Sequence, residues 1–166
     1  MQGNEKVIKS LGEALKAELT AINQYFLHAK MCESWGYARL GAYYRKESIE
    51  EMIHAEKLMS RMLFLEGTPN MTDIGPINIG KNVKAQFESD LALELHAVKQ
   101  LNGAIKMAIE ASDNASRALF EEILKDEEEH VDYLEGQLHA IGEMGIDTFL
   151  GHQLHKGEEE KSADEK

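Results

Sequence analysis

The chain has 166 residues, enough for one domain whose core needs no disulfide or structural metal. Its 30 acidic and 18 basic residues give a net charge of −12, which argues against nucleic acid and anionic membranes as partners and favours cations. The single cysteine, Cys32, excludes an intramolecular disulfide and a Cys-x-x-Cys motif. No apolar run is long enough to span a membrane and no secretory signal is evident, so we expect a cytoplasmic protein.

Apolar residues recur at helical spacing over four long segments. They predict helices at about residues 7–31, 40–65, 83–111 and 115–144. Gly36 is expected to cap the end of the first helix, and the polar cluster 112–114 the start of the fourth. A short fifth helix is expected around residues 147–150.

Both prolines of the chain, Pro69 and Pro76, lie in the segment 67–80, which predicts one long loop between two helical pairs. Short connections make the helices of each pair antiparallel neighbours, and the long loop lets the chain run the length of the bundle. The predicted fold is therefore all-α, an up-down four-helix bundle with one long crossover between the second and third helices. Residues 1–155 are expected to form this one domain, and the acidic segment 156–166 a disordered tail.

The inward stripe of each predicted helix should be apolar if the bundle only has to fold. In all four helices ionisable side chains interrupt it at the same level. The interrupting residues are Glu18 in the first helix, Glu51 and His54 in the second, Glu94 in the third, and Glu127 and His130 in the fourth. The polar residues therefore meet in one layer of the core.

The spacing of these residues is repeated. Glu51 follows Glu18 by 33 residues, Glu127 follows Glu94 by the same number, and a histidine stands three residues after each later glutamate. Glu and His at this spacing lie one turn apart on the same helix face, so both reach ions on the bundle axis. One such pair would usually be solvated surface in so acidic a chain, but the doubled pattern indicates a metal site.

Charge determines what such a site holds. Four ionised carboxylates in a core are costly when they are unpaired, and two divalent cations would cancel their charge. Carboxylate and imidazole ligands without a thiolate suit iron or manganese and argue against structural zinc. The sequence therefore predicts a two-metal centre in the middle of the bundle.

The segments 23–28, 47–55, 63–67, 90–94 and 126–130 resemble those of bacterioferritins, and the resemblance covers nearly the whole chain. It implies a ferritin-like bundle with a di-iron centre. In that centre Glu51 and Glu127 would bridge the two irons, Glu18 and Glu94 would be terminal ligands, and His54 and His130 would each bind one iron. Tyr25 would donate a hydrogen bond to a ligand, and Asp90 and Asp126 would orient the histidines.

The resemblance also implies an activity and an assembly. Bacterioferritins oxidise Fe(II) with O2 or H2O2, as a ferroxidase, and store the Fe(III) as mineral inside a hollow shell of 24 subunits. Two-fold-related subunits clamp a haem b between methionines at position 52, so Met52 is expected to be an axial ligand. The apolar faces of the haem would contact Leu19, Ile22, Asn23 and Phe26. A ferredoxin-type protein is the expected electron donor for iron release.

The resemblance fails near the start of the second predicted helix. Familiar members carry Tyr, His and Asp at positions 45, 46 and 50, and the last two are associated with an iron site on the inner surface. This chain has Arg45, Lys46 and Glu50, and a protonated lysine is a poor iron ligand. Whether such an inner site exists here stays open. Tyr133 stands where Trp is common.

Other polar residues have simpler interpretations. Glu47 lies one turn before Glu51 on the inward stripe and is expected either to support the ligands from behind or to line a channel to the centre. Five histidines have no core glutamate at their level and are expected at the solvent or at subunit interfaces; they are His28, His96, His139, His152 and His155. Two alternative functions remain, a manganese catalase or oxygenase using the same ligands, and a haem-binding electron carrier or inert bundle.

Overall fold

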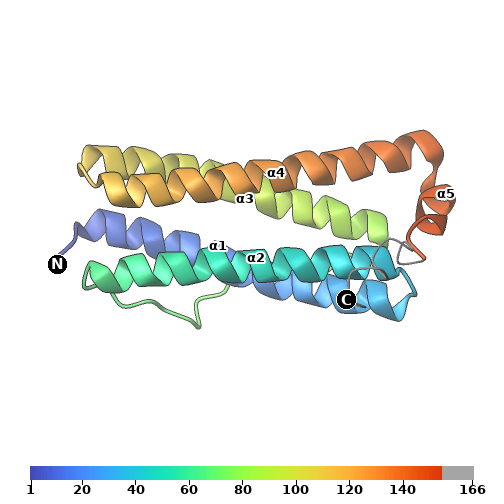
Figure 1. Cartoon of the computed structure of the whole chain (residues 1–166), viewed down its shortest axis with the longest axis horizontal. Helices are drawn as coiled ribbons and strands as arrows, with labels where there is room; N and C mark the ends of the chain where they lie inside the picture. The colour runs from blue at the N-terminus through green and yellow to red at the C-terminus, as the bar shows by residue number, and fades with distance from the viewer. Residues whose placement is uncertain (155–166) are drawn as a thin grey trace, which may run out of the picture.

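The computed structural model describes residues 1–154, and five helices lie in that range (Figure 1). They are α1 (Glu5–Ser34), α2 (Ala38–Phe64), α3 (Val83–Glu110), α4 (Asn114–Met144) and α5 (Ile146–Gly151). All five predicted helices are confirmed, with their ends within one turn of the expected residues. The predicted tail lies outside the described residues. Within residues 1–154 no helix has the length and apolar character needed to cross a membrane.

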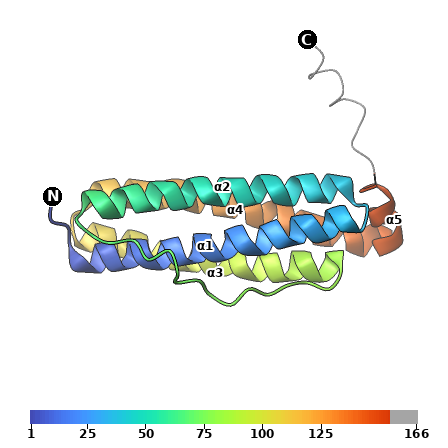
Figure 2. The same cartoon turned by 90° about the horizontal axis from the view of Figure 1, so that it is seen from below.

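The four long helices lie side by side as a bundle (Figures 1 and 2). α1 packs mainly on α2 and α3 mainly on α4, while α1 also contacts α3 and α2 contacts α4. The crossover between α2 and α3 runs along the outside of the bundle from one end to the other, as Figure 2 shows. The predicted up-down bundle with one crossover is therefore confirmed.

The helix ends follow the local sequence. Asn4, Asn82 and Asp113 precede α1, α3 and α4, and each side chain accepts a hydrogen bond from a backbone N–H of the first turn. Gly36 follows α1 with a φ of 85°, a left-handed conformation that glycine adopts without strain. Gly36 and Asp113 lie in the short turns that connect the helices of each antiparallel pair.

The apolar core forms two clusters, one toward each end of the bundle. The largest members of the first are Leu11, Leu15, Leu58, Phe120 and Ile123, and those of the second are Tyr25, Tyr44, Phe87 and Leu134. Along every long helix the predicted polar residues fall between the two. Apolar packing on both sides therefore holds the polar layer in place and keeps bulk water from it.

Three side chains of α1, spaced one turn apart, fasten the crossover to the bundle. Thr20 Oγ1, Gln24 Oε1 and His28 Nε2 accept hydrogen bonds from the backbone N–H groups of Gly75, Asn78 and Gly80 at 2.8, 3.0 and 3.1 Å. The crossover is therefore held along α1 through its backbone N–H groups, and these hydrogen bonds do not depend on the side chains of the crossover.

His28 is fully buried, so the expectation that it lies at the solvent or an interface is wrong. Its Nδ1 lies 2.9 Å from Asp90 Oδ2, and Gln24 donates to the other oxygen of Asp90 at 2.6 Å. Because Nε2 accepts from the Gly80 N–H, Nδ1 carries the ring proton and donates it to Asp90. Asp90 thus orients the α1 side chains that hold the crossover.

Candidate metal centre

The six predicted ligands meet in the middle of the bundle, and each is at most 7% exposed. They form two overlapping groups, in each of which the ligand atoms all lie within 4.8 Å of one another. The first group is Glu18, Glu51, His54 and Glu127; the second is Glu51, Glu94, Glu127 and His130. Two carboxylates, from α2 and α4, therefore belong to both groups.

The two shared carboxylates turn one oxygen toward each histidine. Glu51 Oε2 lies 2.9 Å from His54 Nδ1, and its Oε1 lies 3.2 Å from His130 Nδ1. Glu127 places Oε1 and Oε2 at 3.3 Å from the same two nitrogens. A carboxylate in this position can give one oxygen to each of two neighbouring ions, as bridging ligands of two-metal sites do.

The layer has an approximate two-fold symmetry that follows from the sequence repeat. Residues 76 positions apart occupy equivalent places, and the equivalent pairs are Glu18 and Glu94, Glu51 and Glu127, His54 and His130, and Glu50 and Asp126. The last pair flanks the far ring nitrogens, with Asp126 Oδ2 at 3.1 Å from His54 Nε2 and Glu50 Oε2 at 3.6 Å from His130 Nε2. Tyr25 and Glu47 break the symmetry, since their equivalents are Leu101 and Ile123.

Of the three residues that were expected to support the ligands, two lie against the ligands and one does not. The Tyr25 hydroxyl donates to Glu94 Oε1, and Asp126 lies beside His54, both as expected. Asp90 contacts neither site histidine, because its partners are His28 and Gln24. Its expected role at the centre is therefore corrected to one in fastening the crossover.

Several carboxylate oxygens of the layer are buried and accept no hydrogen bond from the described residues. They are Glu51 Oε1, Glu94 Oε2, Glu127 Oε1 and Glu47 Oε2. A buried acceptor without a donor is destabilising, and cations would satisfy all of these oxygens at once. The residues present therefore fit a pair of divalent metal ions.

The pKa shifts in the layer also favour bound cations. Burial raises the pKa of the Glu18 and Glu94 carboxyls well above the usual range, and the nearby charges of Glu51 and Glu127 add to the effect. Burial lowers the pKa values of His54 and His130, but hydrogen bonds to the surrounding carboxylates outweigh it and raise both above the usual range. Without cations, the layer therefore holds protons more tightly than exposed side chains of the same kinds would.

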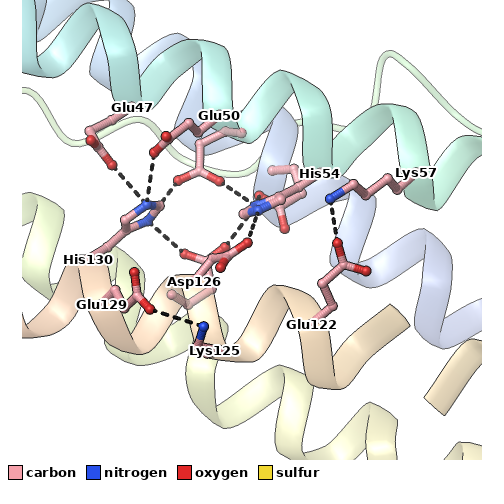
Figure 3. Close-up of polar contacts among 12 residues, drawn as sticks. Glu47, Glu50, His54, Lys57, Glu122, Lys125, Asp126, Glu129 and His130 are labelled. Carbon is pink, nitrogen blue, oxygen red and sulfur yellow. Dashed lines mark hydrogen bonds and ion pairs between the residues drawn. The ribbon is translucent and has the colours of Figure 1, made fainter. Parts of the chain in front are cut away.

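An open cavity of about 520 Å³ borders this layer, and both of its histidines, His54 and His130, lie on the cavity wall. Figure 3 shows Glu47 and Glu50 of α2 pointing toward His130 of α4, and these three residues form a third group with metal-ligand spacing. The stacked rings of Tyr43 and Tyr133 lie on the cavity wall, with centroids 4.0 Å apart. Glu47 therefore lies on the wall of this cavity, which fits the second of the two roles expected for it.

Met52 projects away from the centre, as its position off the inward stripe predicts, and is 48% exposed. Phe26 and Asn23 of α1 are also exposed, and Ile22 is half-buried, whereas Leu19 is buried in the core. Three of the four expected haem contacts are thus accessible beside α2. The haem itself stays a prediction.

The chain is similar to known proteins over nearly its whole length. Residues 8–144 match the ferritin-like domain of the ferritin family. The bacterioferritin of Mycobacterium tuberculosis is 47% identical over 149 residues, which cover 90% of this chain and 94% of that protein. The bacterioferritin of Streptomyces coelicolor is 43% identical over 162 residues, 98% of this chain and 97% of its own. With its helical bundle and paired carboxylate and histidine groups, the chain therefore belongs to the ferritin family, in its bacterioferritin branch.

Proposed function

We propose that this protein stores iron and that its buried centre is a ferroxidase, which oxidises Fe(II) with O2 or H2O2 before the Fe(III) is stored as mineral inside a hollow 24-subunit shell. The observation that carries the proposal is the pair of ligand groups that share Glu51 and Glu127. Family membership supports iron as the metal and the shell as the assembly.

Two Fe(II) ions held side by side can together supply the two electrons that reduce O2 to H2O2. Two Fe(II), O2 and two protons give two Fe(III) and H2O2, so no one-electron oxygen radical has to leave the centre. Shared carboxylates hold the two ions close enough to be oxidised together, while Glu18 and Glu94 supply one further negative charge to each. The four carboxylates thereby balance the charge of two divalent ions.

The residues behind the histidines determine which nitrogen is free to bind. Asp126 Oδ2 lies 3.1 Å from His54 Nε2, and Glu47 Oε2 lies 2.8 Å from His130 Nε2. Asp126 would hold a proton on Nε2 of His54, and a proton on Nε2 of His130 would face the negative charge of Glu47, which leaves the Nδ1 lone pairs facing the shared ligands. Both histidines are therefore oriented to bind iron through Nδ1.

Iron release needs electrons, and Met52 is the residue placed to serve it. Its side chain would hold one side of a haem b, and the same residue of a two-fold-related subunit would hold the other. A bound haem supplies one-electron transfer across the shell wall. The exposure of both Met52 and Phe26 supports this assignment. Met52→Leu should abolish haem absorbance in the purified protein and leave Fe(II) oxidation intact.

Iron uptake tests the main proposal. Fe(II) is added to the apoprotein in air, ferric absorbance is followed, and the iron retained per chain is counted together with the mass of the assembly. We expect uptake far beyond two irons per chain and loss of rapid oxidation in Glu18→Ala. Glu13→Ala, which removes an exposed glutamate of the same helix, is the control and should oxidise iron normally.

Two results would overturn the proposal. Uptake that stops at two irons per chain would exclude storage and favour oxidase chemistry on a small substrate. An unchanged oxidation rate in Glu18→Ala would exclude this centre as the ferroxidase.

A further inference from the structure

The third group, Glu47, Glu50 and His130, has features of a cation site beyond its acidic character. Glu47 is 3% exposed, and its Oε2, which accepts no well-aligned hydrogen bond from the described residues, faces His130 Nε2 at 2.8 Å. Glu50 Oε2 lies 3.6 Å from the same nitrogen. Figure 3 shows the three side chains converging at the cavity. A divalent ion would satisfy the buried oxygen and both carboxylates.

His130 contributes to this group only in part. Its Nδ1 faces the central carboxylates, and its Nε2 faces Glu47 and Glu50. A neutral imidazole has one lone pair, so it cannot bind an ion of the centre and an ion of the third group at once. When Nδ1 binds iron, Glu47 and Glu50 remain as the ligands of the third group.

A positively charged side chain already pairs with those two carboxylates. Lys46 Nζ lies 3.0 Å from Glu50 Oε1 and 3.6 Å from Glu47 Oε1. An alkylammonium is charged at neutral pH, so Lys46 brings a full positive charge to both carboxylates. Its stem is attached to the same helix as both glutamates, and the ammonium therefore competes with any free cation at a high local concentration.

We propose that Lys46 is a built-in cation that occupies the Glu47 and Glu50 carboxylates and keeps a third divalent ion from resting there. The inference rests on the proposed function, because it assumes that the central layer takes the other two ions. Iron that passes the cavity would then continue to the centre instead of accumulating at its mouth. The Lys46 ammonium neutralises the carboxylates of the passage, so the passage binds divalent ions less tightly than a complete metal site would.

Cobalt(II) counting tests this, because Co(II) resembles Fe(II) in its ligands and is not oxidised during the measurement. The apoprotein assembly is equilibrated with Co(II) by dialysis, and the ions bound per chain are counted against free concentration. We expect two tight ions per chain in the wild type and a third in Lys46→Gln, bound at least about tenfold more tightly than any third ion of the wild type. Lys46→Arg should keep the third ion out.

Two controls locate the effect. Lys57 lies on the same cavity but pairs with Glu122 at 2.7 Å, as Figure 3 shows, so Lys57→Gln should leave the third-ion affinity within about twofold of the wild type. Adding Glu50→Gln to Lys46→Gln should remove the third ion again, because it removes one of its ligands.

The outcomes separate this inference from the proposed function. A third ion that binds wild type and Lys46→Gln equally tightly, or no third ion in Lys46→Gln, overturns the role of Lys46 while two central ions still bind. Fewer than two tight ions in the wild type would instead contradict the two-metal centre itself.

Discussion

At the level of single residues, Tyr25 and Tyr43 differ in what their hydroxyl groups contact. The Tyr25 hydroxyl donates to Glu94, whereas the buried Tyr43 hydroxyl has no hydrogen-bond partner among residues 1–154. Outer hydrogen bonds of this kind orient metal ligands and commonly change metal affinity by about 10–100-fold. Tyr25 is therefore a positioning residue for Glu94.

Tyr25→Phe should weaken Co(II) binding at one of the two central positions by about tenfold, because Glu94 loses the donor that fixes its carboxylate. Dialysis or calorimetric titration measures the effect. Tyr43→Phe is the matched control and should bind both ions like the wild type. Equal affinities in all three proteins would show that Tyr25 only packs.

The raised pKa values in the layer predict how cation binding depends on pH. Without cations the pKa values of Glu18, Glu94, His54 and His130 all lie above their usual ranges, so these groups keep their protons to higher pH than exposed side chains do. Cations must displace these protons, and affinity should therefore fall as the pH is lowered from about 7.5 to about 6. Calorimetry in buffers of different ionisation enthalpy counts the protons, and binding without proton release would contradict the assignment.

The six central residues were predictable because two independent patterns, the inward stripe and the repeated 33-residue spacing, select the same side chains. Periodicity shows that a polar residue faces inward but not which inward partner it meets. The resemblance assigned Asp90 to the site histidines, and periodicity could not correct this, although Asp90 pairs with His28. His28 was missed because its partners are a backbone N–H of the crossover and a carboxylate 62 residues away.

At the level of elements, the crossover is the segment whose path could least be predicted. Its prolines and glycines indicate a loop, but its course depends on backbone N–H groups that bind Thr20, Gln24 and His28. Gly80 also packs so closely on the start of α3 that a Cβ would lie 2.2 Å from the backbone nitrogen of Gln86. Contacts of this kind leave no periodic pattern in the sequence.

His28→Ala should loosen the crossover locally. It removes the acceptor of the Gly80 N–H and a partner of buried Asp90, and unsatisfied buried groups cost about 1–3 kcal/mol each. Hydrogen exchange should show lost protection at residues 78–80. Asn102→Ala, which removes an exposed side chain bonded to the carbonyl of Val98 in its own helix, should not change exchange there. Unchanged protection in His28→Ala would mean that other contacts hold the crossover.

For the whole molecule, the polar layer makes stability depend on bound cations. Two apolar clusters flank a layer of buried acids and histidines, which would destabilise the bundle if it were fully ionised and empty. Protons relieve this in the cation-free protein, and cations relieve it more completely. In the proposed centre the same residues would limit the stability of the apoprotein and bind the metal.

Replacing Glu18 and Glu94 together by glutamine should separate the effect of these residues on the stability of the apoprotein from their effect on metal binding. Both carboxyls favour the neutral form, so the thermal midpoint of the apoprotein should change by no more than about 2 °C. The gain from Co(II), about 2.7 kcal/mol at a free concentration 100 times the dissociation constant, should be lost. Calorimetric scans measure both, with Glu13→Gln as the control. A variant that still gains stability from Co(II) would exclude these two residues as ligands.

The repeat that builds the centre is imperfect, and the imperfections fall on one side. Tyr25 and Glu47 both act on the half that holds Glu94 and His130, and apolar residues take their places in the other half. Two ions bound in these halves would experience different fields, so we expect them to differ in affinity and in reduction potential. Although nearly symmetric, the proposed centre would then fill one position first and give up one electron more easily than the other.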